Sequence, residues 1–407
     1  MTPVRGQAPL PDETARPEVE RPPLRAISER GPVSFADPGI TVDDIAAVVR
    51  ALESGWITTG PECDKLEREL ATYLGCPYVV GVSSCTAALE IALAWLDLPP
   101  GARVAVPTWT FVASAFAAVR NGATPVLVDV DPHTLNMSPA SLEAALATGI
   151  SAVVAVHFGG VAVDRAVHEL CAAAGVPVVE DAAHAFGASD HRGRLWGEGS
   201  VGACFSFYAT KNMTSGEGGA LATSSEEVAT FARTYRLHGL SAASWSRHLD
   251  GANGRYDCAV PGIKANLPDL LAALARSQLA RFPDLQARRR TLVERYRAGL
   301  AAIPGIEVVP ALPVAGAADH LQVVLLEEGT DRDRVAVALA DAGVTTSVHF
   351  QPLHRFEWFR HNAEIGPGGV PVADRLAGRA LSLPLHPALD VADVDRTCNA
   401  LAGAVGR

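Results

Sequence analysis

The middle of the chain alternates short apolar stretches with stretches of helical periodicity, and this alternation restricts the possible folds strongly. Helix-like stretches at 86–96, 111–122, 138–149 and 166–175 separate most of the apolar ones. Continuous apolar strands separated by helices are typical of a mostly parallel sheet covered on both faces. The sequence therefore predicts an α/β fold whose large domain has a mostly parallel seven-stranded sheet sandwiched by helices. The expected strands are YVVGVS (78–83), RVAVP (103–107), PVLVDV (125–130), AVVAVHF (152–158), VPVVED (176–181), CFSFY (204–208) and GALAT (219–223).

The pattern changes after residue 264. Residues 267–303 have the composition of a long helix, with a break near Pro283. A strand at 320–327, a helix at 331–343, a strand at 344–350 and further helices should follow. We therefore expect a large domain at 33–270 and a smaller C-terminal α/β domain at 271–407. Residues 1–32 are rich in proline and charge, which predicts a disordered leader.

Composition argues against several classes of protein. The net charge is −11 and no basic stripe occurs, so nucleic-acid binding is not expected. No apolar run reaches the length of a membrane-spanning helix, and the leader lacks the apolar segment of a secretory signal. The seven cysteines are scattered and form no CxxC pair, which favours reduced thiols in a cytoplasmic protein.

Lysine is rare in this chain, which makes one lysine notable. The chain has 34 basic residues, of which three are lysines: Lys65, Lys211 and Lys264. Lys211 lies in the nearly uncharged segment 203–223, before the GEGG sequence at 216–219. Arginine stays protonated, whereas a buried lysine can lose its proton and form a Schiff base. The alternative is a lysine that extends its amine into solvent.

Two further motifs could bind a cofactor. The sequence Ser84-Cys85-Thr86 lies between a strand and a helix, where free backbone N–H groups favour a phosphate; an ordinary helix cap is the alternative. Asp181 ends an apolar strand, where an acid could hold a proton on a pyridine nitrogen, and His184 follows it. Here the alternative is a capping aspartate and a core histidine. The histidines of the 348–361 segment have no carboxylate or cysteine at metal-ligand spacing, so no metal is expected.

Together, a phosphate-binding turn, an acid at a strand end and a lysine predict a pyridoxal 5'-phosphate site. Their order, with the surrounding segments, resembles the nucleotide-sugar aminotransferases of the DegT/StrS type. These belong to fold type I of the pyridoxal-phosphate enzymes, in the aspartate aminotransferase superfamily. The resemblance covers residues 33–407 and includes SGWITTGPECDKLERELATYLG (54–75), SSCTAALEIAL (83–93), EDAAHAFGA (180–188), FSFYATKNMTSGEGGAL (205–221) and GIKANLPDLLAAL (262–274).

The resemblance implies a role for individual residues. Lys211 matches the lysine that holds the cofactor as a Schiff base, and Asp181 matches the partner of its ring nitrogen. Phe111 falls where relatives stack an aromatic ring on the cofactor, with Trp109 as the alternative. His184 falls where a side chain meets the phenolic oxygen of the cofactor.

The phosphate would be bound by residues of two subunits. Many relatives have glycine at the position of Cys85, where the contact uses the backbone N–H, so we expect the substitution to be tolerated. The resemblance further implies an obligate homodimer, because one asparagine reaches the phosphate of the neighbouring subunit. The implied phosphate contacts are Cys85, Thr86, Ser206 and, across the interface, Asn266.

The resemblance also implies the reaction. L-Glutamate would donate its amino group to the cofactor, and a nucleotide-linked keto-sugar would then accept it. The segment GWITTGP (55–61) favours C4 of a dTDP-4-keto-6-deoxyhexose. A dTDP-3-keto-6-deoxyhexose aminated at C3, a UDP- or GDP-sugar aminated at C4, and a non-catalytic regulatory relative are the alternatives. The arginine-rich, lysine-poor composition suggests a GC-rich bacterium, and antibiotic-sugar biosynthesis is expected from that association alone. Asn212, His349 and His354 are the candidate substrate contacts.

Overall fold

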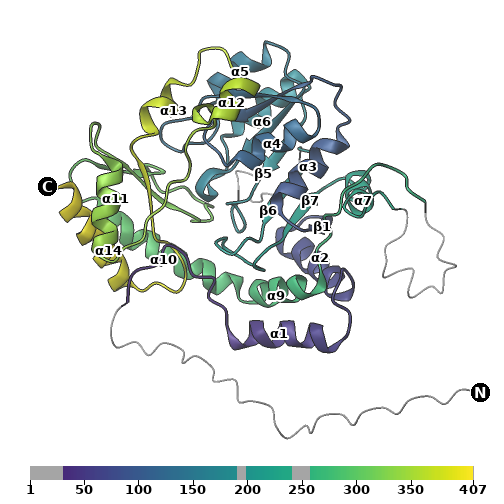
Figure 1. The fold of residues 1–407 in the computed structure, drawn as a ribbon, viewed down its shortest axis with the longest axis horizontal. Helices are drawn as coiled ribbons and strands as arrows, with labels where there is room; N and C mark the ends of the chain where they lie inside the picture. The colour runs from purple at the N-terminus through teal and green to yellow at the C-terminus, as the bar shows by residue number, and fades with distance from the viewer. Residues whose placement is uncertain (1–30, 190–198, 241–256, 407) are drawn as a thin grey trace, which may run out of the picture. The chain divides into compact units, whose positions relative to one another are not determined.

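A large mixed sheet forms the centre of the computed structural model, which describes residues 31–189, 199–240 and 257–406 (Figure 1). Its strand order is β1-β7-β6-β5-β4-β2-β3-β10. All neighbouring pairs are parallel except those of β7, which runs antiparallel to β1 and to β6. The strands are β1 (Tyr78–Val82), β2 (Arg103–Pro107), β3 (Thr124–Val128), β4 (Ala152–Val156), β5 (Val178–Asp181), β6 (Gly202–Ser206), β7 (Gly219–Thr223) and β10 (Glu364–Ile365).

The seven predicted strands are therefore confirmed, and the sheet gains an eighth. Strand β10 consists of two residues from the C-terminal part of the chain and pairs in parallel with β3 at the edge. Its Glu364 forms an ion pair with Arg103 of β2, with 2.7 Å between Oε2 and Nη2. Two residues are too few to show an alternating apolar pattern, so the sequence carried no sign of this strand.

Helices cover both faces of the sheet because successive strand residues point to opposite faces. In β5, Val178 packs with α5 and α6, whereas Val179 packs with α3, α4 and α7. Near β1, helices α2 and α9 cover the face opposite α3 (Figure 1). The helices before residue 240 are α1 (Val42–Glu53), α2 (Pro61–Leu74), α3 (Cys85–Trp95), α4 (Val112–Arg120), α5 (Pro139–Leu146), α6 (Arg165–Ala174) and α7 (Glu226–Tyr235).

The predicted long helix is divided near Arg281 into two helices, close to the expected break at Pro283. An antiparallel three-stranded sheet, in the order β11-β9-β8, follows in the C-terminal part. Helices α10, α11 and α14 pack on one of its faces. The bounds are α9 (Asp269–Ala280), α10 (Phe282–Leu300), β8 (Ile306–Val309), β9 (Gln322–Leu326), α11 (Arg332–Asp341), α12 (Glu357–Asn362), α13 (Pro371–Leu376), β11 (Ala380–Leu383) and α14 (Val391–Val405).

The predicted strand at 344–350 was wrong. This segment forms isolated bridges, Val344 with Val33 and Ser347 with Ser382, and the small sheet is completed by β8 and β11. Six residues of the segment lie at intermediate or low exposure. Val344 packs in the core of the small sheet, whereas Phe350 packs in a separate cluster that contains Trp109. The described residues from Val33 onward form one unit, so the domain boundary at 270 stays a prediction. Of the predicted leader, residues 1–30 lie outside the described residues.

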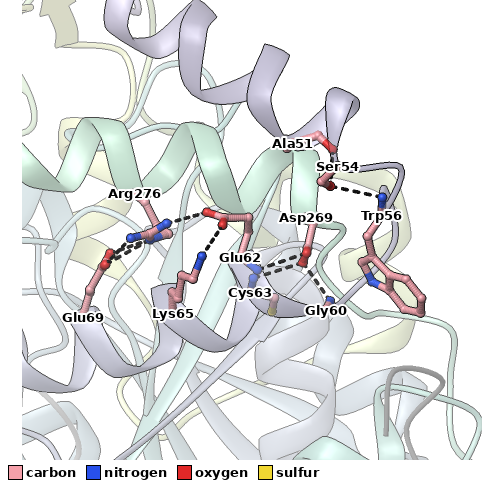
Figure 2. Close-up of polar contacts among 10 residues, drawn as sticks. All are labelled: Ala51, Ser54, Trp56, Gly60, Glu62, Cys63, Lys65, Glu69, Asp269 and Arg276. Atoms are coloured by element: carbon pink, nitrogen blue, oxygen red, sulfur yellow. Dashed lines mark hydrogen bonds and ion pairs between the residues drawn. The ribbon is translucent and has the colours of Figure 1, made fainter. Parts of the chain in front are cut away.

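The loop between α1 and α2 is bound to the start of α9 (Figure 2). The carboxylate of Asp269 accepts hydrogen bonds from the backbone N–H groups of Gly60, Glu62 and Cys63, at 2.7, 3.0 and 3.0 Å. These are donors at the start of α2 that have no partner within that helix, so Asp269 caps α2 from a distant part of the chain. A groove of about 1030 Å³ lies between α1, α2 and α9, where Arg276 bridges Glu62 and Glu69.

Among the described residues, no helix has the length and apolar composition that crossing a membrane requires. All seven cysteines are free thiols, as the sequence predicts.

Candidate active site

The predicted site residues meet at one edge of the large sheet. Because β1, β5 and β6 run in the same direction, their carboxyl ends lie together, which is where α/β sheets usually bind ligands. Asp181 and Ser206 are the last residues of β5 and β6. Gly219 starts the antiparallel β7 at the same edge and pairs with both Val82 and Ser206.

The turn after β1 has the form of a phosphate-binding site. Ser84 is the N-cap of α3, and its side chain accepts a hydrogen bond from the Ala87 N–H at 3.1 Å. Cys85 and Thr86 are the first two residues of α3, so their backbone N–H groups have no acceptor within the helix. Such N–H groups and the helix dipole together favour a phosphate.

Gly219 allows β7 to approach this turn closely. A Cβ atom at Gly219 would lie 2.6 Å from the backbone nitrogen of Cys85 and 2.6 Å from the Phe205 carbonyl oxygen. Both contacts are far shorter than van der Waals separation, and both atoms belong to the backbone, so neither can move easily. Glycine at this position is therefore needed to bring the lysine segment and the phosphate-binding turn together.

Lys211 lies in the turn between β6 and β7, where its N–H donates to the Tyr208 carbonyl at 2.9 Å. Burial lowers the pKa of Lys211 to about 8, and the nearby Cys85 and Asp181 act in the opposite direction. A substantial fraction of the amine is therefore unprotonated near neutral pH, which a nucleophilic lysine requires. The interpretation as a solvent-directed lysine does not fit this environment.

Asp181 is buried, with 6% of its surface exposed. One carboxylate oxygen, Oδ2, accepts a hydrogen bond from Ser114 Oγ at 2.7 Å. The other, Oδ1, accepts the Ala183 N–H at 3.1 Å and lies 3.8 Å from Cys85 Sγ. Hydrogen bonds to the charged form of a carboxyl group stabilise that form. A buried carboxylate held in this way is suited to face a protonated ring nitrogen.

Three histidines surround the lysine. Burial and the charge of Lys211 lower the pKa of His184 and of His349, and the pKa of His349 falls to about 4. His320, which the sequence analysis did not single out, is buried 4.5 Å from His184 between ring centroids, and its pKa is lowered well below the usual value. All three are therefore neutral at neutral pH.

The protonation of His184 follows from its contacts. Its Nδ1 accepts the Gly159 N–H at 3.3 Å, so in the neutral ring the proton lies on Nε2. His184 can thus donate one hydrogen bond through Nε2 to an anionic oxygen. This is the chemistry that the phenolic oxygen of pyridoxal phosphate requires.

The two aromatic candidates lie in different environments. The ring of Phe111 is 57% exposed at the N-cap of α4 and lies 5.8 Å from the ring of Phe350. Trp109 is fully buried, and its Nε1 donates to the His349 carbonyl oxygen at 3.2 Å. Phe111 is therefore the better placed of the two to cover a ring at the sheet edge.

Two of the three predicted substrate contacts have their polar groups engaged within the protein. Asn212 is buried; its Nδ2 donates to the Ala318 carbonyl at 2.6 Å and its Oδ1 lies 2.8 Å from His320 Nδ1. His354 contacts Thr108 through Nδ1 at 2.8 Å and Asp374 through Nε2 at 3.0 Å. His349 uses Nδ1 toward Ser382 Oγ at 3.0 Å. Their role toward a substrate stays a prediction.

Asn266 pairs with Val82, close to the phosphate-binding turn. Its side-chain Nδ2 donates to Thr59 Oγ1 at 2.6 Å, and Lys264 Nζ donates to its Oδ1. Thr59 belongs to the loop that Asp269 binds (Figure 2), so this loop and the Asn266 segment form one surface. The role of Asn266 in a second subunit stays a prediction.

The donor set at this edge fits pyridoxal phosphate. Lys211 has a lowered pKa, and Asp181 is a buried carboxylate. The first N–H groups of α3 lie beside Gly219, and the neutral His184 donates through Nε2. The sequence analysis missed Ser114, Thr110 and His320. The sequence did carry a signal for Ser114 and Thr110: a threonine and a serine lie four residues apart across the start of α4, a spacing that brings two side chains together.

Comparisons with known proteins show relatives that match most of this chain. The model of the DegT/DnrJ/EryC1/StrS aminotransferase family matches residues 38–402. The spore coat polysaccharide biosynthesis protein SpsC of Bacillus subtilis (strain 168) is 39% identical over 377 residues, covering 91% of this chain and 96% of SpsC.

Solved structures are similar over most of the chain. The putative sugar aminotransferase Spr1654 of Streptococcus pneumoniae, in its PMP-form, is 30% identical with a TM-score of 0.83, covering 92% of this chain and 99% of that chain. A DegT DnrJ EryC1 StrS aminotransferase from Brucella abortus is 30% identical with a TM-score of 0.82, covering 92% of this chain and 100% of that chain.

Proposed function

Because the chain belongs to the DegT/DnrJ/EryC1/StrS aminotransferase family, and is thus a pyridoxal-phosphate-dependent sugar aminotransferase, we propose that it transfers the amino group of L-glutamate to a nucleotide-linked keto-sugar. The proposed acceptor is C4 of a dTDP-4-keto-6-deoxyhexose, and the proposed kinetics are ping-pong. The observation that carries the proposal is the amine of Lys211, whose pKa is lowered to about 8 beside the buried Asp181.

Lys211 has two proposed tasks. Its neutral amine is the covalent attachment point of the cofactor, and once displaced by the amino donor it is the base that moves a proton from the donor's α-carbon. Bound pyridoxal phosphate supplies the carbonyl that accepts the amino group and a ring that withdraws electrons from the reacting carbon. Asp181 would hold the ring nitrogen protonated, and His184 Nε2–H would orient the phenolic oxygen.

The remaining residues would bind and shield the cofactor. The N–H groups of Cys85 and Thr86 and the Ser206 hydroxyl are the proposed phosphate contacts, and Phe111 would cover one face of the ring. The thiol of Cys85 is directed away from such a phosphate, because its Sγ donates to the Cys204 carbonyl at 3.1 Å. This supports the expectation that cysteine is tolerated where relatives have glycine.

We further propose a homodimer in which Asn266 reaches the phosphate of the partner subunit. The GWITTGP segment supports C4 of a dTDP-sugar, while C3 of a dTDP-sugar and C4 of a UDP- or GDP-sugar are the alternatives. The relative SpsC is named for spore coat polysaccharide, so the association with antibiotic sugars rests on composition alone.

The test is a screen of dTDP-, UDP- and GDP-linked 3-keto- and 4-keto-sugars with L-glutamate, with the products examined by NMR. We expect an amine at C4 of the dTDP-linked 4-keto-6-deoxyhexose and one equivalent of 2-oxoglutarate. Amination of a different sugar would contradict the proposed substrate but would support the proposed type of reaction. A pyridoxal-phosphate-loaded protein that releases no 2-oxoglutarate with any sugar of the screen would contradict the proposed reaction.

A further inference from the structure

A buried hydroxyl group holds the Asp181 carboxylate from the side of α4. Ser114 lies in the first turn of this helix, is fully buried, and places its Oγ 2.7 Å from Asp181 Oδ2. The other oxygen of Asp181 accepts the Ala183 N–H at 3.1 Å. Oδ1 also accepts a long hydrogen bond from Cys85 Sγ at 3.8 Å, so the donors to the carboxylate come from three segments of the chain.

A second hydroxyl continues this chain of hydrogen bonds. Thr110 Oγ1 lies 2.7 Å from Ser114 Oγ, and 2% of the Thr110 surface is exposed. An ionised carboxylate only accepts hydrogen bonds, so the single proton of the Ser114 hydroxyl points to Asp181. Thr110 must then donate to Ser114. The direction of both protons follows from the charge of Asp181, and each bond polarises and strengthens the next.

We infer that Ser114, supported by Thr110, is a positioning residue that orients the Asp181 carboxylate toward the cofactor ring. Thr110 directly precedes Phe111, the proposed aromatic cover of that ring. The same short segment therefore sets the carboxylate at the ring nitrogen and the side chain on the ring face. This inference rests on the proposed role of Asp181 in holding pyridoxal phosphate.

Three other titratable groups face Asp181. Cys85 from α3 and Cys204 from β6 are buried thiols, and burial together with the charge of Asp181 raises the pKa of each well above its usual value. Both therefore stay neutral across the pH range of an enzyme assay. Lys211 is the remaining group, and it would be bound to the cofactor in the holoenzyme. The neutral donors to Asp181 are therefore the Ser114 hydroxyl, the Ala183 N–H and the Cys85 thiol, and the Ser114 hydroxyl makes the shortest of the three contacts.

The test compares holoenzymes of wild type, Ser114→Ala, Thr110→Val and Ser114→Thr. Coenzyme retained after serial dilution gives a dissociation constant, and the absorbance of the bound coenzyme is followed from acidic to basic pH. Without a sugar present, we expect Ser114→Ala to weaken coenzyme binding about tenfold, because a hydrogen bond to a charged group is lost. Thr110→Val should have a smaller effect, and Ser114→Thr should retain most of the affinity.

The pH profile distinguishes positioning from a purely structural role. Loss of a donor to the charged form of a carboxylate disfavours that form, so the acidic limit of coenzyme binding should move to higher pH in Ser114→Ala. The control is Thr397→Val, which removes a buried hydroxyl that donates to the Asp393 carbonyl at 2.9 Å in α14. This control should leave both the dissociation constant and the acidic limit unchanged.

Two results would overturn the inference. One is a Ser114→Ala holoenzyme whose acidic limit and dissociation constant match those of wild type. The other is a Thr397→Val control that changes both values as much as Ser114→Ala does. Failure of the proposed function is seen separately: wild-type protein that binds no pyridoxal phosphate contradicts the role of Asp181 itself, and the sugar screen tests the acceptor without any variant.

Discussion

His320 Nδ1 lies 2.8 Å from Oδ1 of Asn212, the residue that follows Lys211 in the chain. Because the Asn212 oxygen can only accept, His320 must carry its proton on Nδ1. A histidine at the start of the small sheet thus holds the lysine segment of the large sheet. Both side chains are buried, so neither can exchange its partner for water.

Replacing His320 should therefore lower stability. In His320→Ala the buried Asn212 oxygen loses its donor, and we expect the free energy of unfolding to fall by about 1–3 kcal/mol from this loss, with a further decrease from the cavity. Urea denaturation measures it. His361→Ala removes an exposed histidine from α12 and should stay within about 0.5 kcal/mol of wild type. Equal stability of the two variants would show that the contact is unimportant.

The lowered pKa of Lys211 predicts unusual reactivity of its amine. Acylation of the cofactor-free protein across pH, followed by peptide mass spectrometry, should give a midpoint near pH 8 at Lys211. An ordinary lysine would give about 10.4. Below pH 8 the amine is protonated and unreactive, so labelling should decline as pH falls. Lys65 and Lys264 are exposed and serve as references in the same digest. A Lys211 midpoint above about pH 10 would contradict the buried environment.

Subunit complementation tests the homodimer and the role of Asn266. Lys211→Ala and Asn266→Ala chains with different tags are coexpressed, and the mixed dimer is isolated through both tags. If Asn266 acts across the interface, the mixed dimer holds one intact site and should retain about half of the wild-type activity. Both parent dimers should be far less active.

An inactive mixed dimer would instead place Asn266 in its own subunit, because the Lys211 site would then lack it. The coenzyme content gives an independent readout. One molecule of pyridoxal phosphate per mixed dimer is expected after dilution, against two for wild type.

The close packing of β7 against the phosphate-binding turn at Gly219 predicts that a larger side chain is not tolerated there. Gly219→Ala should lower the free energy of unfolding by about 1–3 kcal/mol or more, because its Cβ would lie 2.6 Å from two backbone atoms. Coenzyme affinity should fall as well, since the phosphate-binding turn must move. The matched control is Gly403→Ala in α14, where an added Cβ meets no atom within 4 Å. That change should stabilise the protein by about 0.5–1 kcal/mol.

The cap on α2 provides a further test of the loop that carries Thr59. Asp269→Ala removes a carboxylate that binds three backbone N–H groups, and we expect a loss of about 1–2 kcal/mol of stability. Asp341→Ala, at the exposed end of α11, is the comparison and should cause little change. Thermal or urea unfolding measures both. If Asp269→Ala lowers the stability as little as Asp341→Ala does, water replaces the carboxylate as the acceptor of the three N–H groups.

The large sheet could be predicted closely because burial on both faces leaves a clear pattern. Strands β2 and β7 have the predicted bounds, and the carboxyl end of β5 at Asp181 was placed correctly. The segment 344–350 was misread because its apolar residues serve separate contacts, Val344 in the core of the small sheet and Phe350 in the cluster of Trp109. Single-residue bridges such as that of Ser347 depend on a distant strand, which local periodicity does not report.

The residues of the candidate site also fall into those that could be expected from sequence and those that could not. The grouping of Lys211, Asp181 and the turn at Cys85 could be expected from sequence, because their chemistry and their positions at or just after strand ends are visible there; their roles toward a cofactor stay predictions. His320 and Ser114 were missed because each acts through a residue that is distant along the chain, Asn212 and Asp181. Their side chains carry ordinary hydroxyl and imidazole groups, and their importance comes from contacts that the fold creates. Polar residues that contact the site residues can therefore be identified only when the tertiary structure is available.

The histidines beside Lys211 have a practical consequence for protein engineering. Lys211, Asp181 and the turn at Cys85 belong to the large sheet, whereas His320 and His349 come from segments attached to the small one. A chimera that grafts the C-terminal third of a homologue onto this chain would exchange two of the three imidazoles and leave Lys211 in place. Such hybrids offer a route to new acceptor preferences without rebuilding the coenzyme pocket.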